Sequence, residues 1–501
     1  MHEDEQNRTA VPYLRRIAHN ATITAGGTLF GQLLGPVIGI ITTRALGAEL
    51  YGLYAVLVQW GAFAAELAKA GWGAALVRFV GVYRARSAMD TLKGAVQAGL
   101  LWAGVTGGAV TLAAFLASEP LSRLVLRHPG SADALRFYCP AVLLTALYGI
   151  TLAALTGFQQ QRLVQLSNAV VGGLVKLVSL VVLLWAGAGL YAALGSSLLQ
   201  DAVVFGLSFV FLRRVFPELQ AAAVESRVEW RQLLGYALTI FATSLFYRYT
   251  FQLDVLVLGM FRPAAEVGLY AVALRLQPLL TLPTYALGET FNPVVAELFA
   301  RGENEALQGV YRSVVRWSLL LTFPLVLVLL TVPEVVLRLF GAEFVAAAPV
   351  LQWICVGTWL GVAFGVAGYV LNMAGKPQVN LVNGLLTAAL NVGLFFVLIP
   401  RFGMMGAAWA YAIVNTGIAL LRMGQVWWLL RLHPWDIAMG KALLLSGMAL
   451  LGALLGSSVS GWLGAAVGLA IFGLLLPMGV SDNDRELWAQ WRKRRESRAA
   501  R

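Results

Sequence analysis

Cysteine and histidine are scarce in this chain, which has two cysteines and four histidines among 501 residues. Both cysteines, Cys139 and Cys355, lie in apolar segments, so no disulfide framework is predicted and small buried side chains are favoured there. The histidines are scattered and indicate no metal site. The sequence also has no Walker-type phosphate loop and no recognisable spacing of nucleophile, base and orienting group. These absences argue against an enzyme, and no metal or cofactor is predicted.

Charge is scarce as well, because only 12% of the residues are charged, whereas 59% are hydrophobic and the mean hydropathy is +0.74. A typical soluble domain has roughly 25% charged residues. Apolar segments of about 20 residues recur along the chain with short polar breaks between them, and that length crosses about 30 Å of hydrocarbon as a helix. The fold class predicted is an all-α polytopic membrane protein.

About fourteen membrane spans are expected, with limits uncertain by about four residues. They are 21–43, 52–76, 94–117, 134–157, 164–187, 189–212, 233–259, 266–299, 313–332, 347–371, 379–400, 403–428, 437–457 and 461–480.

The distribution of basic residues sets the expected orientation. If both termini are cytoplasmic, the inner segments carry 26 Lys and Arg residues and the outer segments carry 6. Cytoplasmic loops are enriched in these residues. We therefore expect a multi-pass protein of the cytoplasmic (inner) membrane with both termini in the cytoplasm. Orientation and contact with anionic lipid explain the net charge of +12 without a nucleic acid partner.

A sequence repeat divides the chain into two lobes. Gly52-Leu-Tyr-Ala-Val56 recurs as Gly268-Leu-Tyr-Ala-Val272, 216 residues later, and the two cysteines are also 216 residues apart. Such self-similarity indicates duplication. Six spans in each lobe would place both in the same orientation, with a pseudo-twofold axis along the membrane normal. The predicted divisions are an N-lobe (1–212), a cytoplasmic link (213–232), a C-lobe (233–430), two further spans (431–480) and a basic cytoplasmic tail (481–501).

Ionisable residues inside the predicted spans cost free energy unless they face protein or water, so they mark candidate sites. Glu66 and Lys69 are three residues apart on one helix and are predicted to neutralise each other. Lys176 and Asp201 lie at similar depth on consecutive spans, and both a buried ion pair and a role in transport remain open.

Arg248 and Arg275 are expected on adjacent helices, facing a central cavity. Two guanidinium groups in a dry cleft suit a phosphate or pyrophosphate, which accepts paired hydrogen bonds from each. Lys176 is the third candidate cation, from the other lobe, and its position in the repeat is taken by neutral Asn391.

The predicted span 266–299 contains Pro278, Pro283 and Pro293, with Gly288 and Glu289 between them. Proline within a span frees backbone carbonyls and bends the helix. Both a moving, cavity-lining helix and a static kink are consistent with this pattern.

The motifs together resemble the polysaccharide or oligosaccharide flippase family, within the superfamily that also contains multidrug and toxic compound extrusion transporters and lipid II flippases. The resemblance covers nearly the whole chain and ends in the stretch from Ile399-Pro-Arg-Phe-Gly to Gly406. Its motif residues are Arg44, Gly47, Gly52, Tyr54, Gly268, Tyr270, Asn383 and Asn391.

The resemblance implies two six-helix lobes that move a polyprenyl-pyrophosphate-linked oligosaccharide from the cytoplasmic to the outer leaflet by alternating access, for cell-surface polysaccharide biosynthesis. Arg248, Arg275 and Lys176 would bind the pyrophosphate or glycan, and the two C-terminal spans would receive the lipid tail. Asp201, Asp254 and Glu289 are candidates for ion coupling. The expected partners are membrane lipid, the lipid-linked glycan and polysaccharide assembly enzymes, and a monomer is expected. A cation- or proton-coupled multidrug exporter and a lipid II flippase are the alternatives.

Overall fold

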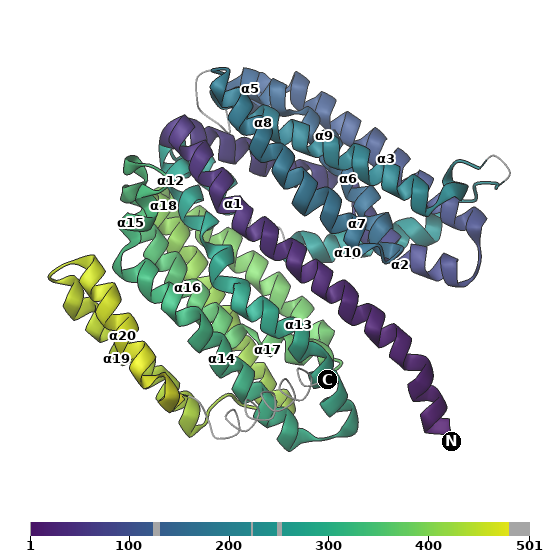
Figure 1. Cartoon of the computed structure of the whole chain (residues 1–501). Coiled ribbons are helices and arrows are strands. Elements are labelled where there is room, and N and C mark those ends of the chain that lie inside the picture. Colours follow the sequence, from purple (N-terminus) through teal and green to yellow (C-terminus); the bar gives the residue numbers. More distant parts are fainter. Residues whose placement is uncertain (1, 124–130, 222–223, 248–252, 480–501) are drawn as a thin grey trace, which may run out of the picture. The chain divides into compact units, whose positions relative to one another are not determined.

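The computed structural model describes the whole chain except residues 1, 124–130, 222–223, 248–252 and 480–501 (Figure 1). The described residues form helices and short connections, without a β-strand. Among the described residues, ten helical segments are long and apolar enough to cross a membrane. The prediction of an all-α, multi-pass membrane protein is therefore confirmed, whereas the count of about fourteen spans stays a prediction.

Two of these ten segments, Gly26–Lys69 and Gln378–Leu430, each overlap two predicted spans. Each is interrupted by one non-helical glycine, Gly47 (φ 71°, ψ 175°) in the first and Gly403 (φ 57°, ψ −134°) in the second. Glycine adopts positive φ without the penalty that a Cβ imposes. The chain therefore turns at these glycines, where the sequence predicts a break between spans.

The chain forms two compact units. The first contains Met1–Arg275 and Val392–Ala407, and the second contains Leu276–Asn391 and Ala408–Arg501. The long helix α18 (Pro377–Leu430) contributes to both. The predicted lobe limits come from the sequence repeat, whereas the two units are defined by contacts between residues. The units therefore do not test the lobes, which remain a prediction.

Unit 1 is built mainly from the N-terminal helices. Its elements are α1 (His2–Lys69), α2 (Trp72–Ala85), α3 (Met89–Leu116), α4 (Ser118–Leu121), α5 (Ser131–Tyr138), α6 (Pro140–Gly157), α7 (Gln161–Gln165), the π-helix η2 (Leu166–Gly172), α8 (Gly173–Trp185), α9 (Leu190–Val215), the short 3₁₀ turn η3 (Pro217–Leu219), α10 (Trp230–Tyr247), α11 (Leu253–Phe261) and α12 (Ala264–Arg275).

The core of unit 1 joins α2, α3, α6 and α10 around Trp72, which is fully buried. The predicted span 52–76 ends differently in the structure. Positive φ angles at Ala70 (45°) and Gly71 (80°) interrupt the helix, which resumes as α2 and continues to Ala85. Gly71 lies against the Ala237 carbonyl of α10, where a Cβ would clash. This close approach accounts for the break, which a hydropathy pattern does not register.

The connection after α9 is attached to unit 1 by partly buried polar contacts. The Lys93 ammonium on α3 donates to the carbonyls of Ala221 (2.7 Å) and Val224 (2.9 Å), and the Tyr83 hydroxyl donates to Glu229 (2.9 Å). The predicted cytoplasmic link is thus docked along α2 and α3 in its described part.

Unit 2 contains the remaining helices. They are α13 (Gln277–Arg301), α14 (Asn304–Thr331), α15 (Pro333–Arg338), the 3₁₀ segment η5 (Ala342–Ala347), α16 (Ala348–Gly365), α17 (Ala367–Met373), most of α18, α19 (Ile437–Ser457) and α20 (Gly461–Gly479). Pro278 stands at the first turn of α13, and the helix continues through Pro283 and Pro293. The proline-rich segment is interrupted at Leu276, before its first proline. That proline then lies at the start of a new helix, where proline is well tolerated.

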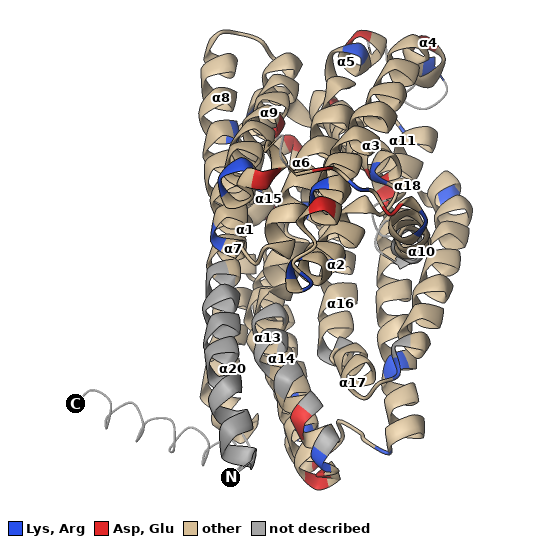
Figure 2. Cartoon of the chain, turned by 90° about the vertical axis from the view of Figure 1, so that its right-hand side faces the viewer, with Lys and Arg blue, Asp and Glu red and all other residues tan. Residues whose placement is uncertain are grey.

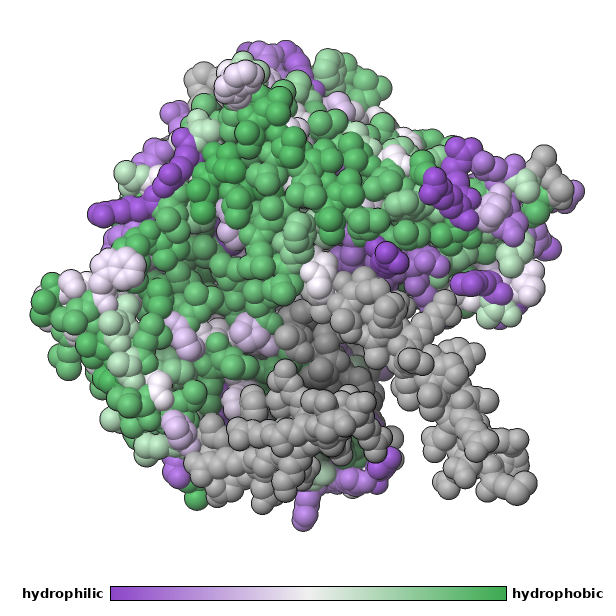
Figure 3. Space-filling model, in the orientation of Figure 1, coloured by the Kyte–Doolittle hydropathy of each residue, from purple (hydrophilic) through white to green (hydrophobic). Residues whose placement is uncertain are grey.

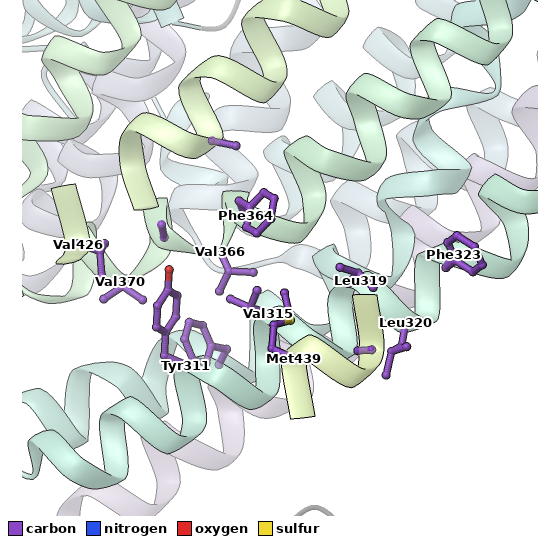
Figure 4. Close-up of a cluster of buried hydrophobic side chains, with 14 of the residues drawn as sticks. Tyr311, Val315, Leu319, Leu320, Phe323, Phe364, Val366, Val370, Val426 and Met439 are labelled. Atoms are coloured by element: carbon purple, nitrogen blue, oxygen red, sulfur yellow. The ribbon is translucent and has the colours of Figure 1, made fainter. Parts of the chain in front are cut away.

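The core of unit 2 is an apolar cluster in which α14 meets α16, α17, α18 and α19 (Figure 4). Tyr311, Val315 and Leu319 follow one face of α14 at helical spacing. Polar contacts fix the start of α19 to the same helix: the Arg316 guanidinium pairs with Asp436 (3.3 Å), and Asp436 caps α19 by accepting from the Met439 N–H (2.6 Å).

Large hydrophobic side chains cover much of the surface (Figure 3). Leu101, Leu116, Leu444 and Leu474 are among those that are more than half exposed. Figure 2 shows that acidic and basic residues occupy little of the helical ribbon. This surface suits hydrocarbon, not water.

Candidate functional site

Two cations in unit 1, Lys176 on α8 and Arg275 at the end of α12, converge on Tyr54. Both interact electrostatically with the Tyr54 hydroxyl, which lies on α1 after the break at Gly47. Lys176 and Arg275 are 99 positions apart in the sequence. The predicted grouping of these two cations is therefore present within unit 1.

The Arg275 guanidinium lies against α1. Its Nη1 donates to the Gly35 carbonyl at 3.5 Å, and its Cζ is 5.9 Å from the centre of the Tyr51 ring. A Cβ at Gly39 would collide with the same guanidinium. Gly39 thus leaves room for a long cation beside the helix, while the Tyr51 ring offers a cation–π contact.

Lys176 lies near Asp201 of α9 without a close ion pair. The two groups interact electrostatically, but the described residues include no carboxylate within 4.0 Å of the Lys176 ammonium. The Asp201 carboxylate instead accepts a hydrogen bond from Thr145 of α6 at 3.0 Å. The buried-bridge interpretation is therefore weakened, since the carboxylate has another partner and the ammonium keeps donors for a ligand.

Tyr51 and Tyr54 belong to the candidate site, although the sequence did not identify them as binding residues. The sequence predicts Tyr54 only as part of the repeated motif and gives no role to Tyr51. The structure places both buried, with ring centres 5.9 Å apart, and the Tyr54 hydroxyl is 3.3 Å from that of Ser197 on α9. The repeat marks Tyr54, whose counterpart is Tyr270, but it does not mark Tyr51, whose counterpart is Val267.

Asp254 has neutral hydrogen-bond partners. It is buried on α11, where its carboxylate accepts from the Tyr270 hydroxyl at 2.8 Å and from the Val255 N–H at 2.7 Å. In the part of the chain that the structure describes, no Lys or Arg forms an ion pair with it. These contacts give Asp254 a structural explanation, and its role in ion coupling stays a prediction.

Glu66 and Lys69 form an ion pair at 2.5 Å, with both side chains 19% exposed. The prediction that they neutralise each other is confirmed. A Cβ at Gly149 of α6 would touch the Lys69 side chain, so the pair is packed against that helix.

Two of the predicted site residues cannot be placed. Arg248 lies outside the described residues, and although Glu289 is within α13, its side chain is outside them as well. Their roles remain predictions.

The motif residues of α18 are buried in unit 2. Asn383 exchanges two hydrogen bonds with Gln425 (2.6 and 2.8 Å) across the two halves of the helix, which supports a packing role. Asn391 is fully buried, and neither its amide nitrogen nor its amide oxygen has a hydrogen-bond partner among the described residues. On α1, Arg44 is exposed three residues before Gly47.

The cluster of Lys176, Arg275, Tyr51 and Tyr54, which we name the cation cluster, presents ammonium, guanidinium and phenol donors together. These groups bind the oxygens of an anion, and guanidinium does so in paired hydrogen bonds. In the described chain, no group of three or more His, Cys, Asp or Glu residues is arranged to hold a metal ion. The donors of the cluster suit the oxygens of an anion, and anion binding by these residues stays a prediction.

Comparison with known families gives two matches. The model for the family described as "Polysaccharide biosynthesis protein" matches residues 17–299, which is more than half of the chain. The MatE family model matches residues 239–397.

Among curated proteins, the "Probable low-salt glycan biosynthesis flippase Agl15" of Haloferax volcanii is 28% identical over 168 residues, which cover 33% of this chain and 36% of that protein. The chain spans less than half of the length of the curated relatives it matches.

Solved structures show the same fold. The lipid II flippase MurJ, in an inward closed conformation, aligns with a TM-score of 0.71 at 12% identity, over 91% of this chain and 98% of that one. An inward-facing multidrug resistance MATE family transporter of the MOP superfamily aligns with a TM-score of 0.65 at 17% identity, over 80% of this chain and 94% of that one. The predicted all-α membrane-transporter fold is therefore confirmed, whereas the number of spans and the layout of the two lobes stay predictions.

Proposed function

Because the chain belongs to the polysaccharide biosynthesis protein family of the MOP superfamily, we propose that it is a flippase that moves a polyprenyl-pyrophosphate-linked oligosaccharide across the membrane. The transfer runs from the cytoplasmic to the outer leaflet by alternating access and serves cell-surface polysaccharide biosynthesis. The observation that carries this proposal is the cation cluster. The Arg275 guanidinium lies 5.9 Å from the Tyr51 ring centre, and both Lys176 and Arg275 interact electrostatically with Tyr54 within an apolar unit.

The physical argument concerns the head of the cargo. A pyrophosphate carries negative charge and cannot enter hydrocarbon without compensating cations, whereas a prenyl tail gains nothing by leaving lipid. Lys176 and Arg275 supply that compensation, Tyr51 and Tyr54 supply an aromatic wall, and Arg248 is retained as a predicted third cation. The transmembrane potential, which is about 2.3 kcal/mol per charge per 100 mV, can drive the cycle.

Several further assignments belong to the same proposal. The protein acts in the cytoplasmic membrane as a monomer with cytoplasmic termini, next to polysaccharide assembly enzymes, and it catalyses no covalent reaction. Asp201, Asp254 and Glu289 are proposed for ion coupling. Among them, Asp201 is favoured by its position beside Lys176.

A multidrug exporter coupled to cations or protons is the second candidate. The MatE match over residues 239–397 favours it, as does a carboxylate, Asp201, in unit 1. In that mechanism organic cations would need an anionic site, and the two cations at Tyr54 oppose such binding. A lipid II flippase is similar to our proposal, because its cargo has the same pyrophosphate. It differs only in the rest of the head group.

Mass spectrometry of lipids that stay with the gently purified protein tests the proposal. We expect a polyprenyl-pyrophosphate glycan in the wild type and its loss in the Lys176→Ala/Arg275→Ala double variant. The matched control is Glu66→Ala/Lys69→Ala, which removes a mutually neutral pair from the same unit and should retain the lipid. Bulk phospholipid alone, together with organic cations that compete with protons for binding, would assign the protein to the exporters instead.

A further inference from the structure

The two copies of the repeated motif lie directly against each other within unit 1. A Cβ at Gly52 would collide with the Ala264 carbonyl and the Gly268 nitrogen, and a Cβ at Gly268 would collide with the Ala48 carbonyl and the Gly52 nitrogen. The part of α1 after Gly47 and helix α12 therefore touch through their backbones. Figure 1 shows α12 beside α1.

This contact has the symmetry of the repeat. Ala48 and Ala264 are 216 residues apart, as are Gly52 and Gly268. Each glycine thus packs on the other copy of the same alanine and the same glycine. Equivalent residues meet in this reciprocal way only near a twofold axis. The contact therefore marks where the pseudo-twofold axis of the duplication passes between its halves.

The helical breaks of both copies lie at the same end of this contact. The first copy turns at Gly47, and the second turns between α11 and α12 at Arg262 and Pro263. Both turns fall on the outer side in the orientation that the basic residues predict.

A third turn, at Gly403 in α18, is clamped to the second copy. The Met404 N–H donates to the Glu266 carboxylate at 2.6 Å, and the Arg262 guanidinium donates to the Pro400 carbonyl at 3.1 Å. The α11–α12 turn and the Gly403 turn are thus joined as one piece on one side of the symmetric contact.

We propose that the contact of Gly52 and Gly268, which we name the glycine clasp, is the outer gate of the transport cycle. The two copies are joined in this structure and separate when the cavity opens outward. This inference rests on the alternating access of the proposed function, but not on the identity of the cargo.

Glycine suits a gate of this kind because backbones touch without interlocking side chains. The surfaces can part and meet again with no change of rotamer, and small residues pack closely in membranes for the same reason. A larger side chain in either position would hold the helices apart.

Arg275 couples the clasp to the cation cluster. It lies seven residues after Gly268, about 10 Å along α12, and donates to Gly35 on α1. It therefore joins α12 to the part of α1 before Gly47, next to the part that forms the clasp. A phosphate that takes the donors of Arg275 competes with the Gly35 carbonyl and weakens this contact, so that binding of an anionic cargo favours opening of the gate.

A bulky side chain introduced at the clasp tests the gate by a measurement that does not require the cargo. In a background that lacks Cys139 and Cys355, the reporter is Tyr51→Cys, at a buried position next to Gly52 of the clasp. We expect little labelling by a membrane-impermeant maleimide from outside in this background, and at least a tenfold faster reaction when Gly268→Leu is added. The matched control is Gly206→Leu on α9, where a Cβ meets open space and labelling should stay slow. Unchanged labelling in a folded Gly268→Leu protein would overturn the gate.

Cross-linking gives a second measurement that needs no bulky side chain. Ala48→Cys paired with Ala264→Cys should cross-link on mild oxidation in membranes and stop the appearance of surface glycan, which reduction then restores. Thr151→Cys with Ser208→Cys, whose hydroxyls are 2.6 Å apart within the first repeat, should cross-link without stopping it. Failure of the first pair to cross-link, or undiminished surface glycan after it has done so, contradicts the gate. If the clasp behaves as expected but no pyrophosphate lipid is bound, the gate stands and the cargo assignment falls.

Discussion

The two copies of the Gly-Leu-Tyr-Ala-Val motif share a sequence but differ in what their tyrosines contact. The Tyr54 hydroxyl faces Ser197 and two cations, Lys176 and Arg275, whereas the Tyr270 hydroxyl donates to the buried carboxylate of Asp254. Their glycines meet symmetrically at the clasp. Duplication thus kept the contact between the copies and let their polar surroundings diverge.

The same divergence appears deeper in each copy. Lys176 occupies the repeat position of Asn391, which is buried without a hydrogen-bond partner in the described structure. Positive charge is therefore concentrated beside the first copy, and the second copy carries packing contacts. This difference teaches that pseudo-symmetry of the fold does not imply two equivalent binding sites.

Replacing Lys176 by Asn makes the first copy resemble the second and should have the largest effect on function. A hydrogen bond to a charged group is worth about 1.5–3 kcal/mol, so we expect transport to fall about 10- to 100-fold. The measurement is transfer of a fluorescent polyprenyl-pyrophosphate sugar in liposomes, normalised to folded protein. Full transport by Lys176→Asn would remove the proposed asymmetry.

Tyr270→Phe removes the hydroxyl donor from the buried Asp254 carboxylate. We expect a loss of stability of about 1–3 kcal/mol, because a buried acceptor is left without its partner. The thermal melting temperature in detergent should fall by a few degrees. Double substitution with Asp254→Asn should lower it by less than the sum of the single changes, since both alter one contact. Additive losses would show that the two side chains act independently.

Tyr54→Phe should have a smaller effect on stability than Tyr270→Phe. Its hydroxyl contact with Ser197 is between neutral groups at 3.3 Å, and such a bond contributes about 0.5–1.5 kcal/mol. Transport should nevertheless decline, because the hydroxyl that both cations approach is lost. Comparison of the melting temperatures of the two Phe variants decides the order, and an equal drop in both would refute the distinction between the copies.

Asn391→Leu should have the smallest effect. An apolar side chain of similar volume at a buried position without hydrogen bonds costs little and can stabilise. We expect a melting temperature equal to or above that of the wild type, with transport unchanged. A marked loss of transport would instead reveal a ligand or a partner for this amide.

Much of the fold could be predicted from the sequence because hydrocarbon imposes simple rules on composition and length. Apolar segments predict the helices, and the glycines at 47 and 403 fall where breaks between spans are expected. Cys139 and Cys355 are fully buried free thiols, as predicted. The break at Ala70 and Gly71 was not predicted, because it depends on how closely α10 approaches.

The candidate site could be predicted only in part, because the sequence does not say which charges face each other. Lys176 and Arg275 do approach a common group, but Asp254 is engaged by Tyr270 and Glu66 by Lys69. Tyr51 could not be recognised from spacing, since its role depends on a cation from a helix more than 200 residues away.

The sequence by itself determined that this protein is an apolar, helical, duplicated chain, because transfer into lipid and the repeat are properties of residue order and composition. Only the tertiary structure decided that the two motif copies meet at Gly52 and Gly268, and that one tyrosine lies among cations while the other binds a carboxylate. Backbone approach and the pairing of charges depend on distances between helices remote in sequence. Those distances are set by packing, which the periodicity of a single helix does not contain.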